Sequence, residues 1–545
     1  PKTASLQVVR RSDMVGSMRG SLLRQLVLAC VTGILYPFCF PDFDLGSLAW
    51  VVLLPLHLAL DGAAPRRAFW LGWLTGLIAF AGTMSWVVTA MHLYGKLPTA
   101  LSYTAMLLLT AYLGLYVAIY AAGVSWLRKT AFAFIGAPFI WVALEWLRTY
   151  LFSGLPWGLL GYSQYRWLPV IQIADHTGVY GVSFLVALVN AALAELALWA
   201  VERLRGQTPG TFPRLSPAAA VLGMAITLLY GLWYLGRPPQ AGEESRSISV
   251  GLVQANIDQA QKWDVAYRRA TLDRYARLTA RAAEGTALII WPEAATPFLF
   301  EQETGYRGEV TALVRKHGIP LLFGSPALRY YPNGRPYLLN SAYLLSPDSR
   351  ILGRYDKRHL VPFGEYIPAR TILFFLDKLV EGIGDFEPGT VPTILEVPLK
   401  PRDASAGLPA RFGVGICYEV IFPDLVREFA KRGAEFMVTI TNDAWYGVSS
   451  APYQHFGMVV LRAVENRVAF ARAANTGISG FIDPQGRILL ATTIFSEQAV
   501  TGVIPLGRTR TFYTRHGDVF AYTCAIITGL LLLAAQLRLG RSDGR

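Results

Sequence analysis

Apolar residues form long runs through the first 236 residues of the chain and again near its C-terminus. About 20 consecutive apolar residues in a helix are needed to cross a hydrocarbon core of about 30 Å. The runs of this length predict eight membrane spans, at 22–40, 46–61, 68–90, 98–124, 130–151, 176–201, 215–236 and 518–537.

Between 247 and 507 the pattern changes to short apolar runs that alternate with amphipathic stretches. β-Branched and aromatic runs ended by Pro, Asn, Asp or Gly are typical of strands, and they occur at 247–257, 286–294, 319–327, 340–347, 412–419 and 436–445. Helical periodicity is found at 264–284, 305–317 and 453–475. Strands buried on both faces and separated by helices predict a layered α/β domain.

The composition fits a membrane protein. Hydrophobic residues make up 53% of the chain and charged residues 16%, where a soluble domain carries about 25% charge. The net charge of +13 could indicate nucleic acid binding, but the Lys and Arg residues stand at the ends of apolar runs instead of in one basic segment. The four cysteines and seven histidines lack the spacing of a disulfide framework or a zinc site, and no phosphate-binding loop is present. We therefore expect no metal and no cofactor.

The basic residues also predict the orientation. Lys and Arg mark cytoplasmic loops, and they lie in the N-terminal segment, in alternate loops and in the tail, for example at Arg24, Arg66, Arg67, Arg128, Arg203, Arg205, Arg214, Arg538 and Arg541. Both termini are then cytoplasmic, and seven spans place the α/β domain on the opposite side.

The predicted organisation has five parts. Residues 1–21 form a cytoplasmic segment outside the fold, in which Met14 and Met18 are candidate starts. Residues 22–236 form a seven-span bundle and residues 247–507 the α/β domain. Residues 518–537 form the eighth span, and 538–545 the cytoplasmic tail.

Three polar residues stand at or near the ends of predicted strands, where an α/β sheet collects catalytic side chains. Glu293 follows LIIWP, Lys357 lies in GRYDKRHLVPFGEYIP, and Cys417 ends GVGIC. A base can take the proton of a thiol, and a cation can stabilise both a thiolate and an oxyanion. Taken singly, each residue also fits a structural role: a buried thiol, a turn glutamate and a solvated lysine.

In combination, the motifs WPE, YDKRHLVPFGE and GICYE resemble the Glu-Lys-Cys triad of the nitrilase, or carbon-nitrogen hydrolase, superfamily. This resemblance implies an α-β-β-α sandwich over 247–507. It also implies that Glu293 is the general base, Lys357 the oxyanion-stabilising cation and Cys417 the nucleophile. Glu365 then matches the second glutamate that positions the triad.

A narrower resemblance covers the whole chain. The stretches WGLLGYSQ, QANIDQAQKWD, ITNDAWYG, QHFGMVVLRAVENR and NTGISGFIDPQG are similar to those of the apolipoprotein N-acyltransferase family. That resemblance implies a monomeric multi-pass enzyme of the bacterial inner membrane with a periplasmic catalytic domain. It implies transfer of an acyl chain, typically from the sn-1 position of phosphatidylethanolamine, through a cysteine thioester. The acceptor is the α-amine of a lipoprotein's diacylglyceryl-cysteine, and lysophospholipid is released.

An acyl-enzyme that must react with an amine instead of water needs an apolar pocket near the bilayer. The candidate walls are Trp263, Tyr418, Trp445, Tyr446, and Phe374 and Phe375 of TILFFLDKLV (371–380). Residues 371–380 fit either a lid in the membrane interface or core packing. A backbone N–H near Tyr418 is expected to help Lys357 hold the oxyanion. Glu419 fits either support of the active site or a salt bridge at a strand end.

Two other functions are compatible with parts of the pattern. A membrane-anchored amidase or nitrilase would share the triad, but one span would suffice as its anchor. A transporter with an appended domain would carry charged or broken helices in matching halves of its membrane part. Apart from Glu145, Arg148 and a few others, the spans show little of this.

Overall fold

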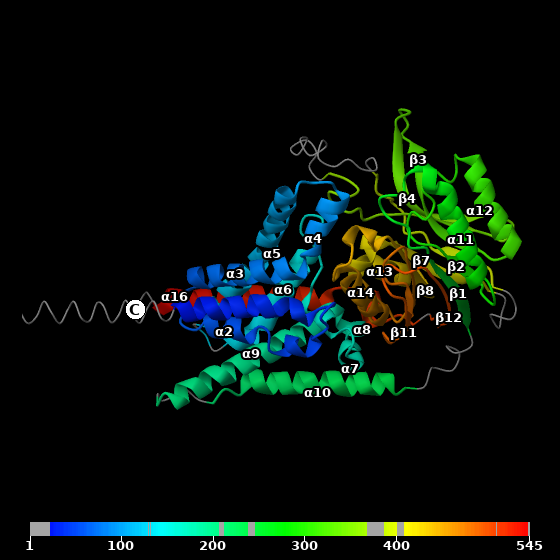
Figure 1. The fold of residues 1–545 in the computed structure, drawn as a ribbon. Coiled ribbons are helices and arrows are strands. Elements are labelled where there is room, and N and C mark those ends of the chain that lie inside the picture. Colours follow the sequence, from blue (N-terminus) through cyan, green and yellow to red (C-terminus); the bar gives the residue numbers. More distant parts are fainter. Residues whose placement is uncertain are drawn as a thin grey trace, which may run out of the picture.

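The computed structural model describes residues 22–128, 130, 132–206, 212–237, 246–367, 386–399, 408–507 and 509–542. Within these ranges the chain forms a helical bundle joined to an α/β domain (Figure 1). The segment 371–380, with Phe374 and Phe375, lies outside the described residues, so the two alternatives for it stay predictions.

Five helices of the described residues are long and apolar enough to cross a membrane. They are Leu22–Cys39, which ends in the 3-10 turn η1 (Tyr36–Cys39), α5 (Thr99–Leu127), α9 (Val179–Leu204), α10 (Leu215–Leu235) and the Val519–Arg538 part of α16 (Val519–Ser542). A sixth span results if α3 (Pro65–Thr83) is counted together with α4 (Trp86–Thr89) and the π-helical turn η3 (Ala90–Tyr94). These two parts meet at a bend of 53°.

The two other predicted spans have a different form. Residues 46–61 fold into the short helices η2 (Gly46–Trp50) and α2 (Leu54–Ala59). Residues 130–151 contain α6 (Ala133–Tyr150), which packs between α5, α9 and α16 but does not reach the apolarity of the five helices. The count of eight therefore stays a prediction.

The charged pair of α6, Glu145 and Arg148, faces the interior, as expected for charges in a membrane bundle. Glu145 accepts hydrogen bonds from the Trp141 indole at 2.9 Å and the Leu160 N–H at 2.7 Å. Arg148 donates to the carbonyl of Trp157 at 2.7 Å. Both charges thus hold the WGLLGYSQ loop, and this loop ends in the 3-10 helix η4 (Leu160–Gln164).

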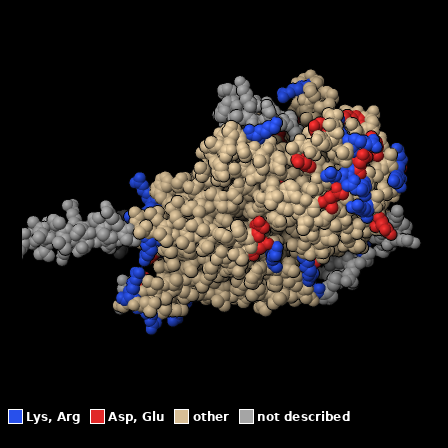
Figure 2. Space-filling view, in the orientation of Figure 1, with Lys and Arg blue, Asp and Glu red and all other residues tan. Residues whose placement is uncertain are grey.

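The surface of the bundle shows few Lys, Arg, Asp or Glu residues over most of its length in one view (Figure 2). Lys and Arg gather at the end of the bundle far from the α/β domain, and charges of both signs cover the α/β domain itself. An uncharged band between two charged ends is the surface that a bilayer requires.

The α/β domain is built on two six-stranded sheets. Their strand orders are β12-β1-β2-β3-β4-β5 and β11-β10-β9-β8-β7-β6. The first contains β1 (Ser247–Gln254), β2 (Leu288–Ile290), β3 (Leu321–Tyr330), β4 (Pro336–Leu345), β5 (Ile351–Asp356) and β12 (Gln498–Pro505). The second contains β6 (Leu395–Val397), β7 (Ala410–Ile416), β8 (Phe436–Thr441), β9 (Ala469–Ala474), β10 (Gly480–Ile482) and β11 (Ile488–Ala491). The inner trios β1-β2-β3 and β7-β8-β9 are parallel, and the outer pairs are antiparallel.

The two sheets pack face to face between layers of helices. Alternate residues of β1, such as Val250 and Leu252, share one core with Val414 and Ile416 of β7. The opposite face of the first sheet packs on α11 (Arg268–Ala282) and α12 (Thr304–His317). Helices α13 (Pro423–Lys431) and α14 (Ala451–Asn466) cover the second sheet. The expected α-β-β-α sandwich is therefore present.

The six predicted strands are confirmed within a few residues as β1, β2, β3, β4, β7 and β8. The prediction of one helix over 453–475 is wrong in its last third. Helix α14 ends at Asn466 because Arg467 adopts the left-handed conformation, with φ of 51°, and the chain continues as β9. Its sequence AFARAA is buried throughout as a central strand, although alanine and arginine favour helices.

Helix α14 lies between the sandwich and the bundle, and its whole length from Gln454 to Asn466 is buried. One continuous apolar core runs from the bundle into the second sheet. Polar contacts cross the same boundary, and they are Trp157 to Gln454 at 2.6 Å, Tyr162 to Arg462 at 3.1 Å, Val179 to Glu465 at 2.9 Å and Asp175 to Arg467 at 2.7 Å.

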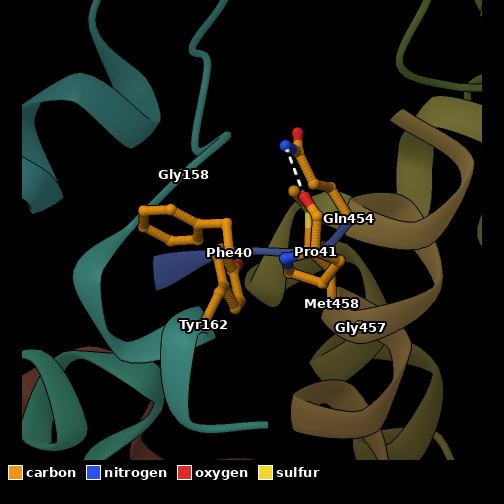
Figure 3. A pocket seen from close by; sticks show the side chains of 7 residues that line it. All are labelled: Phe40, Pro41, Gly158, Tyr162, Gln454, Gly457 and Met458. Carbon is orange, nitrogen blue, oxygen red and sulfur yellow. Dashed lines mark hydrogen bonds between the residues drawn. The ribbon is translucent and has the colours of Figure 1, made fainter. Parts of the chain in front are cut away.

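The boundary is closely packed. A cavity of only about 10 Å³ lies between the bundle segments and α14, where Gln454 donates to the carbonyl of Pro41 at 2.9 Å (Figure 3). The remaining short helices lie near this boundary or on the sandwich: α7 (Leu168–Ile171), α8 (Ala174–Thr177), α15 (Phe512–His516), η5 (Val265–Tyr267), η7 (Cys417–Ile421) and η8 (Asp443–Tyr446). The α/β domain is thus joined to the bundle over a broad contact and not by linkers alone.

Candidate active site

Cys417 lies at the sharp turn from β7 into η7. Its φ of 53° places it in the left-handed region, which costs a residue with a side chain about 1–2 kcal/mol. Strained conformations of this kind cluster at functional sites. The thiol is buried, so the turn holds it beneath the surface of the domain.

Lys357 directly follows β5, and its ammonium lies between two carboxylates. Its Nζ atom is 2.8 Å from Glu365 Oε2 and 3.5 Å from Glu293 Oε1. Glu293 comes three residues after β2. The structure therefore brings Glu293, Lys357 and Glu365 together from distant parts of the sequence.

Both carboxylates are held by further donors. The Asn340 amide donates to Glu293 Oε1 and to Glu365 Oε1, at 2.8 Å each. The Asn442 N–H donates to the other oxygen of Glu293 at 2.9 Å, and the Val361 N–H donates to Glu365 at 2.8 Å. Asn340 is a site residue that the sequence reasoning missed, because an asparagine in the middle of a strand carries no motif.

Electrostatics keep the Lys357 ammonium charged and the Cys417 thiol protonated. Burial lowers the pKa of Lys357, but the Glu365 and Glu293 carboxylates more than reverse this and raise it above its ordinary value. Burial raises the pKa of the Cys417 thiol, Glu293 raises it further, and Lys357 partly offsets the rise. Since a thiolate and not a thiol is nucleophilic, the role expected for Cys417 would require a base.

A second buried lysine, Lys262, also borders the site and was missed from the sequence. Its ammonium donates to the main-chain carbonyl of Glu293 at 3.1 Å. Burial lowers the pKa of Lys262 to about 8, against the opposing influence of Glu293 and Cys417. The only sequence signal was its place in the QKWD stretch, one residue before the expected wall residue Trp263.

Glu419 connects the turn at Cys417 to the residues that follow Lys357. One of its oxygens accepts from the Ile416 N–H at 2.8 Å, and the other from the Tyr355 hydroxyl at 2.7 Å. The second oxygen also accepts from the N–H groups of Arg358 at 2.7 Å and His359 at 3.2 Å. Glu419 is therefore buried and held by four hydrogen-bond donors, and its support of the active site stays a prediction.

The aromatic residues expected as pocket walls lie toward the bundle. Tyr446 packs on Trp86 and Trp157, with ring centroids 4.8 and 6.1 Å apart, and Trp445 lies 5.9 Å from the ring of Tyr94. The Tyr418 hydroxyl donates to the carbonyl of Gly154, in the loop after α6, at 3.2 Å. Trp263 is half-buried. Three of the four rings thus contact bundle segments directly.

Among the described residues, no group of three His, Cys, Asp or Glu side chains is arranged to hold a metal ion. A reaction without metal or cofactor stays a prediction.

Comparison with known proteins covers both parts of the chain. Residues 32–192 match the family model of the apolipoprotein N-acyltransferase N-terminal domain, and residues 249–513 match that of carbon-nitrogen hydrolases. An apolipoprotein N-acyltransferase of Geobacter metallireducens is 42% identical over 515 residues, covering 94% of this chain and 95% of the relative. The chain belongs to the apolipoprotein N-acyltransferase family.

A second relative is also similar over nearly the whole chain. An apolipoprotein N-acyltransferase of Methylococcus capsulatus is 34% identical, covering 96% of this chain and 99% of the relative. Among solved structures, a mutant amidase of the nitrilase superfamily from Nesterenkonia AN1 is similar at 21% identity and a TM-score of 0.35. That match covers 51% of this chain and 94% of the amidase.

Proposed function

We propose that this protein transfers an acyl chain from a membrane phospholipid to the α-amine of the diacylglyceryl-cysteine at the N-terminus of lipoproteins. The observation that carries the proposal is the meeting of Glu293, Lys357 and Glu365 beside the strained Cys417 turn, in a chain that matches its relatives over nearly its full length. The products are a triacylated lipoprotein and a lysophospholipid, the acyl donor being typically the sn-1 chain of phosphatidylethanolamine.

In the first half-reaction Glu293 takes the proton of the Cys417 thiol, and the sulfur attacks the ester carbonyl. Lys357 and the Tyr418 N–H stabilise the oxyanion of the tetrahedral intermediate. The ester C–O bond then breaks, and the departing lysophospholipid oxygen takes the proton from Glu293. A thioester on Cys417 remains.

In the second half-reaction Glu293 removes a proton from the lipoprotein α-amine, which attacks the thioester. The C–S bond breaks, the thiolate regains the proton, and an amide leaves. The scheme is ping-pong. Trp263, Trp445 and Tyr446 would line the path of the acyl chains and keep water away from the thioester.

The proposed membrane arrangement has eight spans, cytoplasmic termini and a periplasmic catalytic domain in the inner membrane. It is supported by the cluster of Lys and Arg at the far end of the bundle (Figure 2). A cysteine at the exposed position 284, as Glu284→Cys, tests it. We expect an impermeant maleimide to label this variant in spheroplasts, whereas labelling only after lysis would contradict the orientation.

Mass spectrometry of the intact protein tests the chemistry. After incubation with phosphatidylethanolamine in detergent, we expect an acyl mass on Cys417 that disappears when a diacylglyceryl-cysteine peptide is added. Cys417→Ser is the control that lacks the thiol of Cys417 and keeps the three other cysteines. Loss of the acyl mass to water alone, or release of ammonia from small amides without any lipid adduct, would instead support an amidase.

A further inference from the structure

A buried histidine lies behind the nucleophile and has no part in the scheme above. His455 comes from α14, and its side chain is fully buried. Its Nε2 atom is 3.2 Å from the main-chain carbonyl oxygen of Cys417. Because a carbonyl oxygen only accepts, Nε2 must carry the hydrogen. The imidazole therefore donates to the backbone of the nucleophile and leaves the thiol free.

Two charged side chains hold the ring of His455 from its other side. Its Nδ1 atom lies 3.0 Å from Asp443 Oδ1 and 3.1 Å from Arg472 Nη2. Asp443 and Arg472 are themselves paired at 2.8 Å, and all three side chains are fully buried. A protonated Nδ1 can donate to Asp443, and an unprotonated Nδ1 can accept from Arg472. Nε2 therefore carries a hydrogen and donates to the Cys417 carbonyl in both protonation states of the ring.

The rest of this cluster is fixed as well. The Thr441 hydroxyl donates to Asp443 at 2.9 Å, and Arg472 donates to the carbonyl of Ile478 at 3.1 Å. Burial raises the pKa of Asp443, but Arg472 and His455 outweigh this and bring it to about 2. Asp443 is thus an anion at every working pH. A paired buried charge of this kind is costly to assemble, which calls for a role at this position.

The role follows from the planarity of the peptide bond. The carbonyl of Cys417 and the N–H of Tyr418 belong to one planar unit and point in opposite directions. When His455 holds the oxygen on the side of α14, the N–H is turned away from α14. As the second residue of η7, Tyr418 has no acceptor within that helix for its N–H.

We infer that His455, oriented by Asp443 and Arg472, is a positioning residue that fixes the Cys417–Tyr418 peptide so that the Tyr418 N–H donates to the oxyanion. The inference rests on the proposed acyl transfer. When the S–C bond forms, the carbonyl π electrons move to oxygen, and a correctly turned N–H stabilises that charge without rearrangement. A peptide free to rotate would present its carbonyl oxygen to the oxyanion and repel it.

The experiment compares two reactions of the same thiol in the full-length protein in detergent. Transfer from phosphatidylethanolamine to Cys417 passes through an oxyanion, whereas alkylation of Cys417 by iodoacetamide displaces iodide and forms none. His455→Met removes the donor, and His455→Gln keeps an Nε2 donor. We expect His455→Met to slow thioester formation about 100-fold, while its alkylation rate stays within about threefold of that of the unsubstituted protein. His455→Gln should recover most of the acylation rate.

Two controls set the scale. Lys357→Met should slow both reactions, because Lys357 stabilises the thiolate as well as the oxyanion. Glu465→Gln, at another buried charge of α14, should leave the ratio of acylation to alkylation unchanged even if it lowers the melting temperature.

Equal slowing of both reactions in His455→Met would overturn the inference in favour of a purely structural histidine, and so would an unchanged acylation rate. Failure of the proposed function looks different. In that case the unsubstituted protein is alkylated at Cys417 but acquires no acyl mass from phospholipid.

Discussion

Replacing Glu419 by glutamine isolates the contribution of one buried charge to the active site, since the two side chains have nearly the same shape. The carboxylate receives four donors, three on one oxygen and the Ile416 N–H on the other. A glutamine can turn its oxygen toward the three donors, but its NH₂ group then faces the Ile416 N–H. At least one buried donor is left without an acceptor in either orientation.

The cost can be worked out from these contacts. A hydrogen bond to a charged group contributes about 1.5–3 kcal/mol, and an unpaired buried donor adds a penalty of similar size. The three remaining bonds also weaken, because charge-assisted bonds are about twice as strong as neutral ones. We expect Glu419→Gln to lower the free energy of unfolding by about 3 kcal/mol. Thioester formation should slow about tenfold or more, because Ile416 directly precedes the strained residue Cys417.

Thermal unfolding in detergent and the rate of acylation from phosphatidylethanolamine measure the two effects. Glu396→Gln is the matched control, because Glu396 is half-exposed and pairs with Arg411 at 3.2 Å on the neighbouring strand. Surface pairs contribute about 0–1 kcal/mol, so both quantities should hardly change in the control. If Glu419→Gln melts and reacts like the control, the hydrogen bonds of Glu419 do not position Cys417 and the reasoning fails.

Three further predictions concern the same site. The pKa of Lys262 is about 8 in the folded chain and ordinarily 10.5, so between these pH values the unfolded chain binds more protons, and the free energy of unfolding should rise with pH by at most about 3 kcal/mol. Melting curves of Lys262→Met should lack this rise, and a rise that persists in the variant would have to come from another group. Burial and Glu293 raise the pKa of the Cys417 thiol, so the rate of its alkylation should still increase above pH 9. The rate should be lower in Lys357→Met, and a plateau at pH 8 in the unsubstituted protein would contradict a raised thiol pKa. A Cβ on Gly324 would lie 2.4 Å from the Ala294 nitrogen and 2.7 Å from Glu293 Cα, so Gly324→Ala should displace Glu293 and lower the acylation rate about tenfold or more. Gly305→Ala is the control, because nothing lies within 4 Å of a Cβ at that position. Equal acylation rates in the two variants would contradict the prediction.

The sequence predicted the parts of the fold in which local pattern and tertiary environment agree. Strands β1 and β8 are short β-branched runs that are buried as such runs require. Strand β9 was predicted as helix because AFARAA has helical propensity, and only its place between β8 and β10 makes it a strand. The helix α6 shows the same limit, because the bonds of Glu145 and Arg148 to the WGLLGYSQ loop are tertiary contacts that no local pattern predicts.

For the candidate site too, the residues in sequence motifs could be predicted, and the residues defined by tertiary contacts could not. Glu293, Lys357, Cys417 and Glu365 stand in motifs, so their resemblance to a known triad could be stated from sequence. Asn340, Lys262 and His455 acquire their contacts only when strands and helices from distant segments meet. Asp443 stood in the quoted ITNDAWYG stretch, but its pairing with Arg472 and His455 required the second sheet and α14 together. Sequence motifs identify groups that react, whereas the groups that orient them depend on the tertiary fold.

The burial of α14 on all its sides has a practical consequence. A fragment cut at 247–507 would expose the side of α14 that meets the bundle, including the site where Gly457 lies against the ring of Tyr165. It would also leave Arg462 and Arg467 without Tyr162 and Asp175. The catalytic half therefore shares its folding unit with the bundle, so purification, crystallisation and inhibitor screening all require the intact chain in a lipid-like environment.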